Sequence, residues 1–245
     1  MPIKVVTFDL DNTLWDVEPA LLRAEEVQRE WLLTHRPGAI DDISHDELWS
    51  LKKRVWKAHP ELAHNVSGMR QLFLQELQRA AGYDEEAARD GARQAFEVFL
   101  AERQIVELYS EALTVLETLA RRFRLGALTN GNADVYKTDA GEYFDFAFLA
   151  EDIGASKPAP DMFRAALSTT GVDASEILHV GDNPEHDVIG ALQVGMHAIW
   201  LNADGTSWPS VHSSEGYAPH ATIKAIGELP AAVTQLELQL SKAAR

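Results

Sequence analysis

The sequence predicts an α/β fold in which a parallel sheet is interrupted, after its first strand, by an insertion made only of helices. Short apolar runs, each followed by turn residues and a helical stretch, recur through the second half of the chain. This alternation is typical of a parallel sheet wrapped by helices. Between the first apolar run and the others lies a long segment with helical spacing. The length of 245 residues allows a core domain and a smaller inserted one.

The predicted strands are short apolar runs that stop at polar or glycine-containing turns. The first run is rich in β-branched residues, which favour strands. In order along the chain, the runs are 3–8, 125–128, 146–150, 177–180, 196–201 and a brief one near 222–223. A final helix is predicted from about Pro230, and the polar segment 202–219 is predicted only as a loop.

The inserted segment is predicted as about four helices with no strand among them. Pro60 is expected to end one helix, and Gly82 marks the end of another. Trp49 and Trp56 lie on the apolar side of a predicted helix, which favours packing inside the helical core over stacking on a ligand. The domain prediction is a core of residues 1–17 and 104–245 with a helical cap of residues 18–103, placed where it would overhang a site at the end of the first strand.

The composition excludes several classes of function. The chain has no cysteine, so disulfides, thiolate metal sites and cysteine nucleophiles are excluded. The formal net charge of -16 repels polyanions, so we expect no nucleic acid and no anionic membrane as a partner. The sequence shows neither an apolar signal stretch nor a run of transmembrane length, which favours a cytoplasmic protein. The oligomeric state is not predicted.

Polar residues gather where four predicted strands end or just after them. They are Asp9 and Asp11 after the first strand, Thr129 and Asn130 after the second, Lys157 after the third, and Asp182 and Asp187 after the fourth. Each cluster alone has a plainer interpretation, as an Asx turn, a helix cap or a solvated lysine. Because the carboxyl ends of parallel strands share one edge of the sheet, their joint occurrence indicates a single site.

These groups have the chemistry that phosphoryl transfer requires. Carboxylates this close repel one another unless a hard cation lies among them, and oxygen ligands favour Mg²⁺. Asp9, Asp182 and Asp187 are the candidates for its ligands. A carboxylate can then attack a phosphate and form an aspartyl phosphate.

The remaining polar residues have candidate roles in the same reaction. Lys157, Thr129 and Asn130 are expected to hold the equatorial phosphate oxygens, where transition-state charge is spread. Asp11 is left as the acid that protonates the leaving oxygen and as the base that then activates water.

Four motifs resemble those of the haloacid dehalogenase-like (HAD) hydrolase superfamily, in the same order and at plausible spacing. They are Phe8-Asp9-Leu10-Asp11-Asn12-Thr13-Leu14, Thr129-Asn130, Lys157-Pro158, and Gly181-Asp182 with Asp187. The first motif is highly specific, and the resemblance spans nearly the whole chain. It implies a Rossmann-like core with a helical cap inserted after the first motif.

The resemblance also implies a role for each motif residue. Asp9 would be the nucleophile and Asp11 the acid and base, with Thr129 and Lys157 binding phosphate. Mg²⁺ would be held by Asp9, the backbone carbonyl of Asp11, and Asp182, with Asp187 as an outer-shell ligand. A magnesium-dependent phosphatase acting on a small phosphorylated metabolite is therefore expected.

Within the superfamily, the chain is similar to capped members of the flavin mononucleotide phosphatase type. The similarity lies in segments 128–133, 156–162 and 177–182, which mainly serve phosphate and metal binding. Trp15 and Arg70 are the candidate substrate contacts outside the motifs. The Trp15 ring could stack on a planar isoalloxazine, and Arg70 could meet a second anionic group.

Three alternatives stay open. A 2-haloacid dehalogenase of the same fold has no use for a second acid/base aspartate or a metal, so Asp11 and Asp182 argue against it. A phosphonate hydrolase would need a Schiff-base lysine in the cap, where the candidates Lys52, Lys53 and Lys57 look like a solvated helix face. A non-catalytic phospho-accepting module of the receiver type would place its acceptor on a later strand and would lack the helical insertion.

Overall fold

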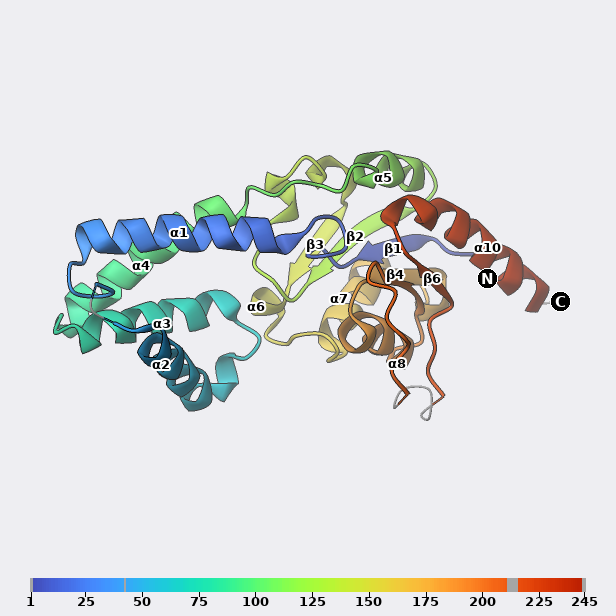
Figure 1. Cartoon of the computed structure of the whole chain (residues 1–245). Coiled ribbons are helices and arrows are strands. Elements are labelled where there is room, and N and C mark those ends of the chain that lie inside the picture. The colour runs from blue at the N-terminus through green and yellow to red at the C-terminus, as the bar shows by residue number, and fades with distance from the viewer. Residues whose placement is uncertain (1, 42, 211–215, 244–245) are drawn as a thin grey trace. The chain divides into compact units, whose positions relative to one another are not determined.

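The computed structural model describes residues 2–41, 43–210 and 216–243, and it divides into two compact units (Figure 1). The first unit comprises Met1–Asp16 and Glu107–Arg245, and the second comprises Val17–Val106. The described strands all belong to the first unit, whereas the described elements of the second unit are helical. The assignment of these units as a catalytic core and a cap stays a prediction.

The described part of the first unit contains a six-stranded sheet in which every pair of neighbouring strands is parallel. The strand order is β3-β2-β1-β4-β5-β6. The strands are β1 (Val5–Phe8), β2 (Arg124–Thr129), β3 (Phe146–Leu149), β4 (Ile177–Gly181), β5 (His197–Leu201) and β6 (Ala221–Ile223). The predicted α/β fold with a Rossmann-like parallel sheet is confirmed, and each strand overlaps a predicted apolar run.

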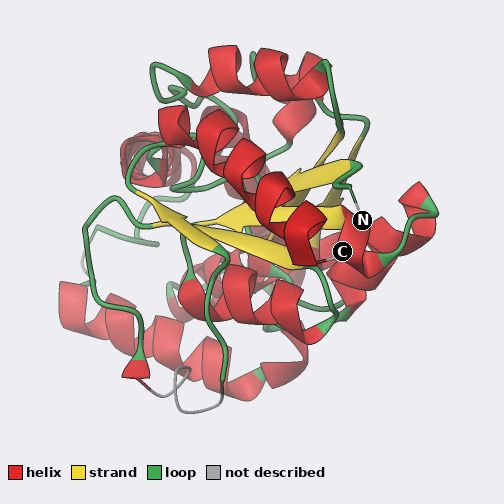
Figure 2. Ribbon diagram, turned by 90° about the vertical axis from the view of Figure 1, so that its right-hand side faces the viewer, coloured by secondary structure: helices red, strands yellow, loops and turns green. Residues whose placement is uncertain are grey.

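Helices cover both faces of the sheet (Figure 2). Helices α5 and α10 lie on one face, and α7 and α8 lie on the other. The helices of this unit are α5 (Ala112–Ala120), α6 (Ala150–Ile153), α7 (Asp161–Thr170), α8 (Gly190–Gln193) and α10 (Leu229–Ala243). One-turn or irregular helices are η2 (Val135–Lys137), η3 (Gly141–Tyr143), η4 (Ala174–Glu176), η5 (Pro184–Ile189) and η6 (Ile226–Glu228). Buried apolar residues of α7 and α8, such as Met162 and Ala191, join the strands in one core cluster.

The sheet has a topological switch point between β1 and β4. From β1, the chain adds β2 and β3 on one side, and β4 to β6 on the other. In open parallel sheets, ligands bind beyond the carboxyl ends of the strands where the order reverses in this way. Because Phe8 lies level with both Ala127 and Val180, the residues that follow β1, β2 and β4 start at nearly the same height. The register therefore gathers the polar motifs at one place.

The second unit contains four described α-helices and one short 3₁₀ turn. They are α1 (Val17–His35), α2 (His45–Ala58), η1 (Pro60–Leu62), α3 (Val66–Ala80) and α4 (Glu85–Arg103). Ser44 and Glu47 form a reciprocal capping box at the start of α2, and the Asp84 side chain accepts a hydrogen bond from the Ala87 N–H at the start of α4. Their apolar faces form a separate core, which includes Leu51, Leu77 and Phe99.

The predicted burial of two tryptophans in this helical unit is wrong. The exposed fractions are 49% for Trp49 and 39% for Trp56. The ammonium of Lys52 lies 5.8 Å from the Trp49 ring centroid and 5.4 Å from that of Trp56. The two rings therefore lie on the outer face of α2, beside a cationic side chain, while Leu51 and Val55 are the buried residues of this helix.

The described part of the segment 202–219 is held by side chain to backbone hydrogen bonds. The Asn202 amide bonds both the backbone N–H and the carbonyl of Thr206, at 3.0 and 2.8 Å. The Trp208 Nε1 donates to the Tyr217 carbonyl at 3.1 Å. Residues 211–215 of this predicted loop lie outside the described residues. Among the helices that the structure describes, none has the length and apolar composition to span a membrane.

Candidate active site

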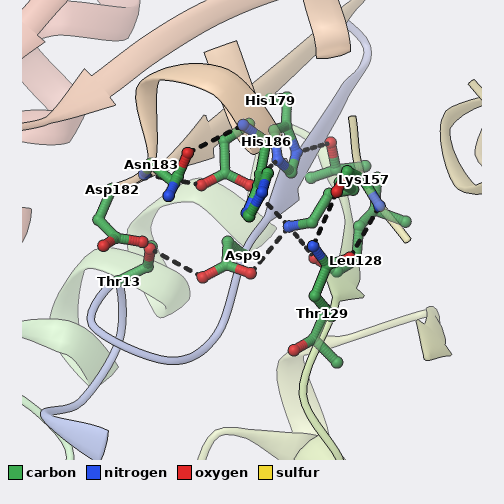
Figure 3. Close-up of polar contacts among 12 residues, drawn as sticks. Asp9, Thr13, Leu128, Thr129, Lys157, His179, Asp182, Asn183 and His186 are labelled. Atoms are coloured by element: carbon green, nitrogen blue, oxygen red, sulfur yellow. Dashed lines mark hydrogen bonds and ion pairs between the residues drawn. The ribbon is translucent and has the colours of Figure 1, made fainter. Parts of the chain in front are cut away.

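The predicted motif residues surround one pocket of about 180 Å³ at the carboxyl ends of the strands. All the residues that line it belong to the first unit. The lining includes the seven predicted residues Asp9, Asp11, Thr129, Asn130, Lys157, Asp182 and Asp187, together with Asn12, Gly131, Asn183 and His186. Figure 3 shows the polar contacts among several of these side chains. The fold thus brings together groups that are up to 178 positions apart in the sequence, from Asp9 to Asp187.

The Lys157 ammonium lies at the centre of the contacts in Figure 3. The side chain is almost fully buried, and its Nζ donates to Asp9 Oδ1 at 2.8 Å and to Asp187 Oδ1 at 2.7 Å. Its third contact is the carbonyl of Leu128. Burial by itself would lower the pKa of Lys157, but the two carboxylates outweigh it and raise that pKa. Lys157 therefore stays charged and holds two buried carboxylates together.

The carboxylates of the pocket carry more negative charge than this one ammonium balances. Burial raises the pKa of Asp9 to about 8, and the neighbouring Asp187 and Asp182 carboxylates add to that rise against the opposing effect of Lys157. Burial raises the pKa of Asp182 to about 6, and the negative charge of Asp187 adds to this rise. When all three are ionised, Asp9, Asp182 and Asp187 carry three negative charges against the one ammonium of Lys157. A divalent cation would supply the missing charge.

The donor set also fits a magnesium ion in its chemistry and spacing. Asp9, Asp182 and Asp187 each offer one carboxylate oxygen, and these oxygens all lie within 4.8 Å of one another. Oxygens bound to one Mg²⁺ lie at most about 4.2 Å apart, twice the usual bond length, so these carboxylates are close enough to approach a single ion with small side-chain shifts. Carboxylate oxygens are hard ligands of the kind that Mg²⁺ prefers.

The surroundings of Asp187 distinguish it from the other two carboxylates. Its Oδ1 accepts from Lys157 and lies 3.3 Å from Nε2 of His179, and its Oδ2 accepts from the Asn183 backbone N–H at 2.9 Å. His179 is fully buried, and its Nδ1 lies 2.9 Å from the Thr7 hydroxyl oxygen. Burial lowers the pKa of His179. Both oxygens of Asp187 are therefore bound by protein groups, which suits a role outside the first coordination shell of a metal.

His179 is not among the predicted site residues, although the sequence contains a signal for it. A histidine inside the apolar run 177–180 lies on a strand that is predicted to be buried. A buried imidazole needs partners for both nitrogens, so its position alone indicates a polar contact within the core.

A glycine allows Asp187 to reach its position. A side chain on Gly181 would collide with the Asp187 carboxyl group. The following Asn183 side chain accepts from the backbone N–H groups of Glu185 and His186, at 3.0 and 2.9 Å, and so starts the helical turn that carries Asp187. The local sequence after β4 thus places one carboxylate at the strand end and a second one turn later.

Asn130 lines the pocket, and its role as a phosphate donor stays a prediction, but its side chain also has a second function in the structure. Its Nδ2 donates to the Lys157 carbonyl at 2.9 Å, and its Oδ1 accepts from the Lys157 backbone N–H at 2.8 Å. The amide therefore fixes the backbone of Lys157, and at most one of its N–H groups is left for a phosphate. Thr129 lines the pocket, and its hydroxyl accepts from the Gly131 N–H at 3.0 Å.

The prediction that Trp15 stacks on a planar substrate is wrong. The ring has no exposed surface, so it offers no face on which a substrate ring could lie. Its Nε1 instead donates to Asp11 Oδ1 at 2.8 Å. Asp11 is half-buried and lines the pocket, so Trp15 touches the predicted acid/base residue and not the predicted substrate.

Arg70, the second candidate substrate contact, belongs to the helical unit and does not line the pocket. Its guanidinium lies 3.7 Å from the ring centroid of Phe99 and contacts Glu25 at 3.2 Å and Gln28 at 3.3 Å. Stacking and ion pairing of this kind bind the guanidinium within its own unit. These contacts indicate a structural role in the helical unit, and a contact with substrate stays a prediction.

Comparison with known proteins gives matches over most of the chain. A family model described as "haloacid dehalogenase-like hydrolase" matches residues 3–195. The 5-amino-6-(5-phospho-D-ribitylamino)uracil phosphatase YigB of Escherichia coli K12 is 34% identical, over 93% of this chain and 94% of that protein. A glyceraldehyde 3-phosphate phosphatase of Pyrococcus abyssi is 29% identical over 81% of each chain. Among solved structures, one described as a 2-haloacid dehalogenase from Pseudomonas syringae pv. Tomato DC3000 is 41% identical, with a TM-score of 0.88, and covers 95% of this chain and 99% of that one.

Proposed function

The chain belongs to the haloacid dehalogenase-like hydrolase family, and we propose that it is a magnesium-dependent phosphomonoesterase that works through an aspartyl phosphate on Asp9. The observation that carries this proposal is the pocket in which Asp9, Lys157, Asp182 and Asp187 lie together beside Asp11. A second carboxylate next to the nucleophile, and a site suited to a divalent cation, are what a phosphoryl transfer needs.

In the first half of the proposed reaction, a carboxylate oxygen of Asp9 attacks the phosphorus of the substrate. The bond from phosphorus to the ester oxygen breaks, and Asp11 donates its proton to that leaving oxygen. Lys157 keeps Asp9 in place through the 2.8 Å contact with Oδ1, which leaves the other carboxylate oxygen to react. The Thr13 hydroxyl lies 3.4 Å from that second oxygen and helps to orient it.

In the second half, water attacks the aspartyl phosphate. Asp11, now ionised, takes a proton from the water as its oxygen bonds to phosphorus, and the bond between phosphorus and Asp9 breaks. Inorganic phosphate leaves the pocket, and the free Asp9 carboxylate is regenerated. Asp9, the backbone carbonyl of Asp11, and Asp182 would hold Mg²⁺, with Asp187 outside its first shell. The cation would offset the phosphate charge that the pocket carboxylates otherwise repel.

Removal of divalent metal is expected to abolish turnover. Protein dialysed against EDTA should not hydrolyse p-nitrophenyl phosphate, and added Mg²⁺ should restore the activity, because the unbalanced carboxylates otherwise repel a phosphate dianion. The same titration followed by thermal melting should show a higher Tm with Mg²⁺, since a cation relieves repulsion among buried carboxylates. Undiminished activity in EDTA would remove the metal from the proposal.

The proposed substrate class is a phosphate ester at the end of a ribityl chain on a planar heterocycle. The YigB name specifies a phosphoribitylamino uracil, and flavin mononucleotide carries the same phosphoribityl arm on a larger ring. The pocket of about 180 Å³ is smaller than the roughly 300–1,000 Å³ of typical ligand pockets, so it can take the phosphate and the adjoining carbons only. The ring would lie outside it. Because Trp15 is buried, stacking on that residue no longer supports flavin mononucleotide as a substrate.

A panel of phosphorylated metabolites tests this class. We expect flavin mononucleotide and a phosphoribityl pyrimidine to exceed phosphoserine and glyceraldehyde 3-phosphate in kcat/KM by roughly tenfold, the effect of about 1.4 kcal/mol of extra transition-state binding. Phosphate release by the purified enzyme measures each value. A higher kcat/KM for phosphoserine would contradict the ribityl class while leaving the phosphatase proposal in place.

The second candidate function is 2-haloacid dehalogenation, which the 41% identity to the Pseudomonas syringae dehalogenase structure favours. The pocket argues against it, because dehalogenation has no use for a second acid/base carboxylate such as Asp11 or for a metal-binding carboxylate such as Asp182. Adding 2-chloropropionate to the panel separates the two functions. Chloride release without phosphate hydrolysis would favour the dehalogenase.

A further inference from the structure

A buried indole binds the residue that carries the proposed acid/base role. Trp15 Nε1 donates to Asp11 Oδ1 at 2.8 Å, and the Trp15 ring has no exposed surface. A buried tryptophan usually finds a partner for its N–H, but most side-chain hydrogen bonds go to backbone or water and not to another side chain. This hydrogen bond therefore joins the buried Trp15 ring to the half-buried carboxylate of Asp11.

The backbone around Trp15 is held as firmly as its ring. The N–H of Asn12 donates to the Trp15 carbonyl at 2.7 Å, and Asn12 has a φ of 60°, in the left-handed region. Trp15 also forms isolated β-bridges with Asp11 and with Leu108. The loop from Asp11 to Trp15 is therefore closed on itself and tied to the segment that follows the helical insertion. The backbone of Trp15 is therefore held in place, and its indole N–H is hydrogen-bonded to the Asp11 carboxylate.

We propose that Trp15 is a positioning residue that holds Oδ1 of the Asp11 carboxylate and so orients this group for its exchange of a proton. The inference rests on the proposed phosphatase function. An indole N–H donates and cannot accept, so it occupies Oδ1 and never competes for the proton. In the first half, the proton of the Asp11 carboxyl group passes to the leaving oxygen as the bond from phosphorus to that oxygen breaks. In the second half, the Asp11 carboxylate takes a proton from water as water bonds to phosphorus and the bond to Asp9 breaks.

The test replaces the N–H and keeps the ring. Trp15→Phe retains an aromatic side chain in the core but is smaller than indole. The second variant carries 3-benzothienylalanine at position 15, which keeps the indole shape and has sulfur in place of N–H. Comparing the two separates the loss of the N–H from a packing defect. Trp208→Phe is the matched control, because it removes an N–H that donates to the Tyr217 carbonyl, at 3.1 Å. Thermal melting of each variant reports its stability.

Rapid-quench measurement of the phosphoenzyme separates positioning from packing. For both Trp15 variants, we expect two rates to fall roughly tenfold: formation of the phosphoenzyme from an alkyl phosphate, and hydrolysis of that phosphoenzyme. This is a part of the roughly 10²–10⁴-fold that a positioned acid/base group contributes. Formation from p-nitrophenyl phosphate should slow less than about twofold, because nitrophenolate leaves without a proton. In the Asp11→Asn background, Trp15→Phe should cause no further loss, since both changes act through one carboxylate.

Other outcomes overturn the inference. Equal slowing for the alkyl and aryl phosphates, or the same loss with Asp11→Asn present, would show that Trp15 acts only through packing. A crystal structure of Trp15→Phe gives a readout that does not need turnover. We expect the Asp11 carboxylate to leave its present orientation, and an unchanged orientation would count against positioning. If the wild-type protein formed no phosphoenzyme from any phosphate, the proposed function would fail, and the crystal structure would still decide whether Trp15 orients Asp11.

Discussion

Replacing Asp9 by asparagine is expected to reduce phosphatase turnover by roughly 10⁴-fold or more, the scale seen when a covalent nucleophile is removed. The amide matches the carboxyl group in shape but has no charged oxygen with which to attack phosphorus. Steady-state hydrolysis of p-nitrophenyl phosphate measures the loss, and intact mass during turnover should show phosphoenzyme for the wild type only. Asp145→Asn is the matched control. Asp145 is exposed and precedes the first residue of β3, away from the carboxyl ends of the strands that form the pocket.

The same variant is expected to fold, and to be the more stable protein when metal is absent. The pKa of Asp9 is raised from 3.8 to about 8, so the folded protein favours the neutral carboxyl group. A raised carboxyl pKa means that wild-type stability is lost as the pH rises from about 4 to about 8, whereas asparagine is neutral throughout. Melting in EDTA should therefore show a Tm advantage of Asp9→Asn that grows over this range. Retention of wild-type turnover would exclude Asp9 as the nucleophile.

Replacing Lys157 by methionine is expected to cause the largest loss of stability among single changes in the pocket. Methionine keeps the length of the side chain but leaves the Asp9 and Asp187 carboxylates buried without their ammonium. Breaking a buried ion pair on one side costs about 3–5 kcal/mol, and for a chain of this size each kcal/mol lowers Tm by about 2–4 °C. Differential scanning calorimetry in EDTA measures the change, and turnover should fall as well because Asp9 loses its orientation.

A second substitution checks that charge, and not packing, is responsible. Asp9→Asn added to Lys157→Met removes one of the two stranded carboxylates, so the double variant should melt higher than Lys157→Met alone. If Lys157→Met melted like the wild type, or if the second substitution lowered Tm further, the buried charge balance described for this pocket would be incorrect.

Much of the fold follows from local patterns in the sequence. Each apolar run with turn residues after it became a strand, and the insertion became helices that end close to Pro60 and Gly82. The boundaries moved by a few residues: β1 begins at Val5, two residues later than predicted, and the last helix begins at Leu229. Buried residues repeat about every two positions in a strand and about every 3.6 positions in a helix. The spacing of apolar residues within a short segment therefore indicates which of the two it forms.

The partner of each side chain did not follow from the patterns. Helical spacing showed that Trp49 and Trp56 share a side of α2, but it did not show that other helices pack against Leu51 and Val55 instead. The sequence did not show which anionic group Arg70 contacts. In the structure, its guanidinium lies over the Phe99 ring and pairs with the Glu25 carboxylate. Which helix covers which face depends on contacts between distant segments, and no local period encodes them.

The sequence alone was enough to predict the α/β class and the gathering of the charged motif residues at the strand ends, because parallel strands bring their carboxyl ends to one edge whatever their separation along the chain. Only the tertiary structure decided which contacts each of those residues makes. Lys157 binds Asp9 across 148 positions, and the Asn130 amide binds the Lys157 backbone across 27. Trp15 and Asp11 are four positions apart, yet their contact depends on a turn with a positive φ at Asn12. Hydrogen bonds depend on distance and direction in three dimensions, which the order of residues does not specify.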